Sequence, residues 1–223
     1  MRPTPLVLAA SILIASCLSS LPTKPNDREW SVLLANYQAI DALRNAPSAP
    51  ANATRKQQIE LLLENHKKLA PTYDAFFDTR LRDYYERTAD LRAAQLYARE
   101  KIILGDEYMD VLARYDKAIE MYSAALTLDP ENVAAKERIA LAKSRRFASM
   151  DAFVTVKAGM KEEQVRRIVG LPREDWIKQV VQNHRVYSVW IYPKQDGGAS
   201  AVYFDNGVVY HTNWNAAAPA ASK

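Results

Sequence analysis

The chain has 223 residues and a formal net charge of +4, and the interleaving of acidic with basic residues excludes the concentrated basic field of a nucleic-acid-binding protein. Its single cysteine excludes an intrachain disulfide, so packing has to stabilise the fold. Apolar residues make up 48% of the chain, which is enough for one or two domains with packed cores.

The N-terminal residues have the organisation of a secretory signal peptide. Arg2 gives a cationic tip, and the apolar run from Leu6 to Ile14 is too short to span a membrane, which takes about 20 residues. The stretch ending in Ala15-Ser16-Cys17 resembles the lipobox of bacterial lipoproteins. The resemblance implies cleavage before Cys17, lipidation of its thiol and, because Leu18 follows rather than Asp, sorting to the periplasmic face of the outer membrane. The alternative is a secreted protein whose cysteine lies there by chance.

Residues 28–148 have the pattern of successive helices. Apolar residues between Trp30 and Leu43 recur at helical spacing, which indicates one buried face. Thr54 is placed to cap a second helix, and Pro71 is expected to end it. A third helix is expected from about Thr72, and its apolar face would contain Phe76, Phe77, Leu81, Tyr84, Thr88 and Leu91.

The segment Tyr115–Asn132 resembles the second helix of a tetratricopeptide repeat. Ala118, Tyr122, Ala125 and Pro130 have the signature spacing of that family. The small alanines would let a neighbouring helix approach, the tyrosine would fill the remaining gap, and the proline would stop the helix. One repeat cannot bury its own face, and about three are normally needed. The other helices are therefore degenerate repeats or unrelated partners, or the whole is a helical bundle with one repeat-like hairpin.

The residues before this segment resemble the first helix of the same repeat. Leu104-Gly105 and Tyr108 have the expected character, but they lie one residue too far from Ala118. A longer turn between the two helices is therefore expected.

From Asp151 the pattern changes to that of a small α+β fold. A short amphipathic helix is expected before Gly170 and Pro172, which end it. Asn206-Gly207 indicates a tight hairpin because both residues tolerate positive φ. The expected strands are residues 176–181, 185–192, 201–204 and 208–214.

Short motifs in this half resemble, by their order, the BamE/SmpA/OmlA family. They are Gly159-Met160, Glu163-Gln164-Val165, Gly170 with Pro172, Trp190 with Tyr192, and Phe204 to Gly207. The resemblance implies a lipoprotein module of two helices on a three-stranded antiparallel sheet, which supports the machine that inserts β-barrels into the outer membrane. The chain departs from that family by an extra strand before the usual first one and by its long helical half. The glycines are interpreted as turn residues, and Trp190 as packing under the helices.

The strand at 185–192 has apolar side chains on both faces. Alternation puts Val186, Ser188, Trp190 and Tyr192 on one face and Tyr187, Val189 and Ile191 on the other. The two helices can cover only one face. The second set is therefore a candidate partner-binding surface, the alternative being that it rests on the helical half.

No pattern of catalytic or metal-binding residues is recognised. The glycines do not form a phosphate loop, and His66, His184 and His211 are far apart, with no cysteine or carboxylate at metal spacing. His66 is interpreted as a helix-flank residue. Acidic residues interleaved with Lys and Arg along the helices are interpreted as solvated surface, so no catalytic constellation is expected.

The predicted fold class is α+β. An N-terminal all-α, tetratricopeptide-like domain is followed by a small domain of helices packed on a three- to four-stranded antiparallel sheet. The predicted divisions are a signal peptide at 1–16, a tether at 17–27, the helical domain at 28–148, the BamE-like domain at 149–215 and a disordered tail at 216–223.

The function expected from these features is that of a non-enzymatic envelope lipoprotein that acts as a protein–protein interaction scaffold, in β-barrel assembly or in envelope integrity. The expected partners are envelope proteins, including β-barrel assembly components, and the membrane through the lipid; no cofactor, metal or nucleic acid is expected. An inhibitor or adaptor module is the alternative, since β-lactamase inhibitor proteins have a related helix-on-sheet fold. An enzyme that acts on envelope polymers is a third.

Overall fold

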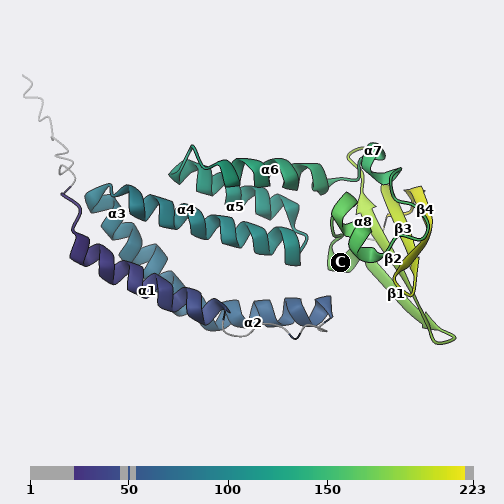
Figure 1. Cartoon of the computed structure of the whole chain (residues 1–223), viewed down its shortest axis with the longest axis horizontal. Helices are drawn as coiled ribbons and strands as arrows, with labels where there is room; N and C mark the ends of the chain where they lie inside the picture. The colour runs from purple at the N-terminus through teal and green to yellow at the C-terminus, as the bar shows by residue number, and fades with distance from the viewer. Residues whose placement is uncertain (1–22, 46–49, 51–53, 219–223) are drawn as a thin grey trace, which may run out of the picture.

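The computed structural model describes residues 23–45, 50 and 54–218. Helices come first and a four-stranded antiparallel sheet follows, which confirms the α+β class (Figure 1). Within the described ranges, no helix combines the length and the apolarity needed to cross a membrane. Cys17, the expected signal peptide before it and residues 219–223 of the expected tail lie outside the described residues. Ala216, predicted as the first residue of a disordered tail, is instead the last residue of the final strand.

Eight α-helices occur in the described part of the chain, with two π-helical segments and one 3-10 turn between or after them. The α-helices are α1 (Asp27–Asn45), α2 (Arg55–Asp74), α3 (Arg82–Thr88), α4 (Leu91–Asp106), α5 (Tyr115–Leu128), α6 (Val133–Arg146), α7 (Met150–Phe153) and α8 (Glu162–Val169). The π segments are η1 (Ala75–Leu81) and η2 (Glu107–Val111), and the 3-10 turn is η3 (Glu174–Trp176).

Pro71 does not end the second helix, contrary to expectation. Thr54 does cap α2, accepting from the N–H of Gln57, but the helix contains Pro71 and runs through η1 into α3 without a break. A proline inside a helix costs about 3 kcal/mol or more. The continuing turns bury Phe76 and Phe77, and each such side chain contributes about 1.5–3 kcal/mol, so their burial offsets the proline.

The prediction for Leu91 was also wrong. The other five apolar positions expected on the third helix are buried, but Leu91 is 73% exposed. The helix ends at Thr88 because Ala89 adopts a left-handed conformation with φ 49°. Asp90 then caps α4, and Leu91 becomes the first residue of that helix.

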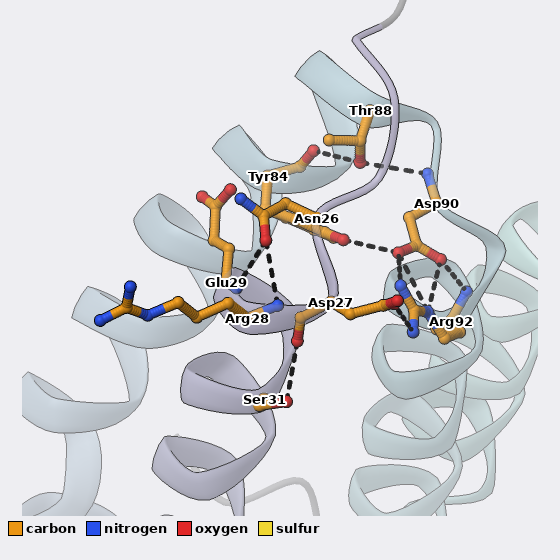
Figure 2. A network of polar contacts seen from close by, with 9 residues as sticks. All are labelled: Asn26, Asp27, Arg28, Glu29, Ser31, Tyr84, Thr88, Asp90 and Arg92. Atoms are coloured by element: carbon orange, nitrogen blue, oxygen red, sulfur yellow. Dashed lines mark hydrogen bonds and ion pairs between the residues drawn. The ribbon is translucent and has the colours of Figure 1, made fainter.

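A polar network holds α1 against the corner between α3 and α4 (Figure 2). The Tyr84 hydroxyl donates to Oδ2 of Asp90 at 2.6 Å. The Arg92 guanidinium lies between two carboxylates, 2.8 Å from Asp90 and 3.0 Å from Asp27 of α1. The hydrogen bonds from Arg92 lower the pKa of the Asp90 carboxyl to about 2. A helix cap and a tertiary contact therefore depend on the same carboxylate.

Helices α4, α5 and α6 pack side by side around the residues of the repeat-like motif. Ala118, Tyr122 and Ala125 are fully buried, as expected, and Pro130 follows the end of α5. Gly105 permits the close approach of α4, since a Cβ there would lie 2.6 Å from Cδ1 of Tyr122. The sequence of the first helix of the repeat lies one residue too far from Ala118, and this extra residue falls where α4 passes into the π-helical segment η2. A π turn contains more residues than an α turn, so it accommodates the extra residue.

The sheet has the order β1-β2-β3-β4, and every neighbouring pair is antiparallel. Its strands are β1 (Ile177–Gln182), β2 (Arg185–Pro193), β3 (Ala199–Asp205) and β4 (Val208–Ala216). The extra N-terminal strand predicted from the sequence is present as β1, at the edge of the sheet. Trp176, predicted as its first residue, lies in η3 instead. Asn206 and Gly207 have φ 47° and 76°, which confirms the predicted hairpin.

Candidate interaction surface

One face of the sheet is covered by the helical half and α8. Trp190 is 6% exposed, its ring centroid lies 4.8 Å from that of Phe204, and both belong to a core that includes Tyr122 of α5 and Val165 of α8. Figure 1 shows the helical half meeting the sheet on the side of α8. This confirms that Trp190 packs under helices, and the same core extends into α5 and α6.

Three hydrogen bonds hold the helical half to the loop that follows α8. The Tyr115 hydroxyl donates to the carbonyl of Leu171 at 2.8 Å and accepts from the Leu171 N–H at 2.9 Å. Arg55 of α2 donates from Nη1 to the carbonyl of Pro172 at 2.7 Å. The Tyr192 hydroxyl donates from the sheet to the carbonyl of Gly170 at 3.2 Å. Because this loop bonds to α2, α5 and β2, it fixes which face of the sheet is covered.

The remaining motif residues serve turns and packing. Gly159, Gly170 and Gly207 all have positive φ, 76° to 88°, so their interpretation as turn residues is confirmed. The N–H of Gly159 donates to the carbonyl of Val209, and the carbonyl of Met160 accepts from the Val209 N–H, both at 2.8 Å. These bonds attach the start of the α8 segment to β4.

The second face of the sheet is open. Ile191, Ala199 and Ala201 form a small cluster there, and its partly buried neighbours all come from residues 176–216, Val189 and Tyr203 among them. No described residue of α1–α6 belongs to it. The alternative that the helical half rests on this face is therefore wrong for the described residues. Tyr187 and Val189 are half-buried, and Ile191 is covered by neighbours on its own face.

Aromatic residues on β3 and β4 extend the open face beyond the residues expected from the sequence. Tyr203 lies opposite Val189, and its ring centroid is 6.1 Å from that of Tyr210 and 5.3 Å from that of His211. Tyr210 is 54% exposed, next to a register shift in the β3–β4 pairing. The alternation of side chains along residues 199–205 would have predicted that Tyr203 lies on the open face. Tyr210 could not be predicted in this way, because the irregular strand pairing that exposes it has no recognisable sequence pattern.

A buried charge cluster in the helical half contradicts the interpretation of its charges as solvated surface. Glu100 of α4 is fully buried and forms an ion pair with Arg44 of α1. Desolvation raises the pKa of the Glu100 carboxyl, although the positive charge of Arg44 lowers it. Nearby, Nε2 of His66 lies 2.9 Å from the Glu107 carboxylate, and this contact raises the pKa of the His66 imidazole.

The histidines do not come together in the structure. His66 is on α2, His184 in the β1–β2 turn and His211 on β4. In the described ranges, no group of three or more His, Cys, Asp or Glu side chains is arranged to hold a metal ion. The candidate site is the open sheet face, which presents Tyr187, Tyr203 and Tyr210 and has no described residue of α1–α8 in its apolar cluster.

No protein-family model, characterised protein or solved structure matches the chain.

Proposed function

We propose that the chain is a lipid-anchored, non-enzymatic scaffold of the bacterial envelope, which holds other proteins on the open face of its sheet. The observation that carries the proposal is the composition of that face. Val189 and Tyr203 are half-buried and lie opposite each other on neighbouring strands. Tyr210 beside them is 54% exposed, and no described residue of α1–α8 belongs to the apolar cluster of this face. Contiguous exposed apolar surface marks interaction sites, and tyrosine is enriched among residues that dominate binding energy.

The proposed anchor places this face near a membrane. Lipidation of Cys17 with two or more acyl chains would hold the protein stably, at about 0.8 kcal/mol for each buried CH₂ group. The residues between Cys17 and α1, which begins at Asp27, would act as the tether.

The resemblances of the two halves favour β-barrel assembly at the outer membrane as the setting. Tetratricopeptide lipoproteins and BamE-like lipoproteins both occur in that machine as separate chains. The present chain resembles a fusion of the two types. We therefore propose that its partners include a component of the assembly machine.

Site-specific photo-crosslinking in envelopes tests this function. A benzoylphenylalanine at Val189 samples the open face, and the same residue at Glu137, exposed on α6, is the matched control. We expect adducts with a β-barrel assembly component from position 189 and none from position 137. Adducts with other envelope proteins only would support a scaffold function but contradict a role in β-barrel assembly. Equal adduct yields at both positions would show that the open face is not the binding surface.

The anchor is tested separately by fractionation. Cys17→Ala should leave an uncut or mislocalised precursor, because the thiol that carries the lipid is gone. If this variant matures and stays with the outer membrane, the lipoprotein assignment is wrong.

A further inference from the structure

A hollow of about 380 Å³ lies where the helical half meets the sheet. It is lined by the first residues of α5, the end of α6, the loop after α8, Trp176 of η3 and the end of β2. Its volume falls within the range of small-ligand sites. This junction groove is distinct from the open sheet face, although Trp176 contributes to the edge of both.

The groove has a strong excess of positive charge. Its lining contains five basic side chains and one acidic side chain: Arg114, Lys117, Arg145, Arg146 and Arg173 against Asp116. Three of the cations have carboxylate partners, since Lys117 pairs with Glu120, Arg146 with Asp116 and Arg173 with Asp175. Within the described chain, Arg114 and Arg145 form no ion pair and no side-chain hydrogen bond. Two guanidinium groups therefore face the groove with unused donors.

The fold holds one of these arginines in place. The aliphatic stem of Arg145 lies against Gly170, where an added Cβ would be 3.2 Å from its Cδ. The groove walls between the cations are apolar or aromatic residues, among them Tyr115, Tyr192 and Pro172, which are buried, and Trp176, which is half-buried. A ligand there would meet apolar walls and a cationic rim.

We propose that the junction groove binds an acidic, extended peptide segment of a partner protein. Carboxylates would accept bidentate hydrogen bonds from Arg114 and Arg145, whose planar forks match that geometry. Apolar side chains of the segment would pack on Trp176 and its neighbours. Aromatic-lined grooves and arginine clusters are both recurring features of peptide recognition.

The sheet edge beside the groove suits an extended chain. Trp176 directly precedes β1, which has β2 as its single neighbour in the sheet. The outer backbone groups of an edge strand can pair with an added strand. A peptide with its acidic end in the groove could therefore continue along β1. This proposal does not depend on whether the open sheet face binds a partner.

Fluorescence anisotropy on the full chain tests the proposal. The probe is a fluorescein-labelled peptide in which Asp and Glu alternate with Phe and Pro, and its matched control has Asn and Gln in place of the acids. We expect the acidic probe to bind at least about tenfold more tightly than the control, because a guanidinium forms stronger hydrogen bonds with a carboxylate than with a neutral amide. The affinity should fall as salt is added.

Two variants locate the binding. Combining Arg114→Gln with Arg145→Gln should raise the Kd of the acidic probe about tenfold. The variant is assayed well below its unfolding midpoint, because the stem of Arg145 packs against Gly170. Arg28→Gln removes one positive charge at an exposed site on α1, where Figure 2 shows the side chain pointing away from the polar network, and it should leave the Kd unchanged.

Three results with the peptide would overturn the proposal. They are equal binding of the neutral peptide, an unchanged Kd in the double variant, and an equal loss of affinity in Arg28→Gln. Binding of phosphatidylglycerol vesicles that depends on the two arginines, with no binding of the peptide, would also overturn it by assigning the groove to lipid.

Discussion

The N-terminal helices and the junction with the sheet are stabilised by different kinds of contact. The first core, from α1 to α4, is largely aromatic and adjoins both buried carboxylates of the described chain, Asp90 and Glu100. The second core, which runs from Met109 through α5 and α6 to the sheet, is also rich in aromatic residues, but it contains small residues such as Ala118 and, among the described residues, no buried carboxylate or cation. The first region should therefore respond to loss of charge and to pH, and the second to changes of volume.

The largest expected effect comes from breaking the buried ion pair of the first region. Glu100→Ala leaves the mostly buried Arg44 guanidinium with only the more distant carboxylate of Asp41, at 3.6 Å, which should lower the free energy of unfolding by about 3–5 kcal/mol. Urea denaturation followed by circular dichroism would measure it. Glu64→Ala, which breaks an exposed pair with Lys68, should change stability by less than about 1 kcal/mol. Equal effects of the two substitutions would contradict the distinction between buried and exposed pairs.

The second effect is a pH dependence due to Asp90. Its folded-state pKa of about 2 lies below the ordinary value of 3.8, so its contribution is present above about pH 4 and is lost as the pH falls toward 2. The contribution is about 2 kcal/mol. Asp90→Asn should therefore be less stable at neutral pH and lose less stability on acidification. Parallel stability–pH curves for the two proteins would show that Asp90 is not the group responsible.

The third effect tests volume at the point where α4 packs against the second core. A Cβ at Gly105 would overlap the Tyr122 ring, and overpacking costs about 1–3 kcal/mol, offset in part by the better helix propensity of alanine. Gly105→Ala should therefore cost about 1–2 kcal/mol in a denaturation experiment. At Gly198 the added Cβ would meet the flexible end of Lys194, so Gly198→Ala should cost less. If the order were reversed, α4 and α5 would not be in close contact at this point.

The sequence predicted the elements whose signals are local. Helix α5, the Thr54 cap, the Asn206-Gly207 turn and the two faces of β2 all follow from spacing or from the preferences of single residues. Where the structure differs from the prediction, the cause is a tertiary contact. Burial of Phe76 and Phe77 carries a helix past Pro71, and Glu100 lies in a stretch of charged residues that looks solvated until α1 packs against it.

The candidate surface was predicted only in part. Alternation identified Tyr187, Val189 and Ile191 as one face of a strand, but it does not say which face the helices cover. That choice depends on Tyr115 and Arg55 binding the loop after α8, from segments far away in the sequence. Arg114 and Arg145 of the junction groove are likewise brought together by tertiary structure.

The smallest expected effect on stability is at the open face. Tyr210 is 54% exposed, so Tyr210→Ser should change the free energy of unfolding by no more than about 0.5 kcal/mol. The same variant should weaken capture of the partner crosslinked at position 189. A large loss of stability would mean that the ring is part of a core, and full retention of the partner would remove Tyr210 from the binding surface.

Hydroxyl-radical footprinting of Tyr203 and Tyr192 tests the central claim most directly, because they lie on opposite faces of the sheet. The account predicts that Tyr203 is modified in the purified chain and protected in native envelopes, where its partner is present. Tyr192, which is buried under the helical half, should be protected in both. Equal modification of Tyr203 in the two preparations would contradict the claim that the open face binds a partner.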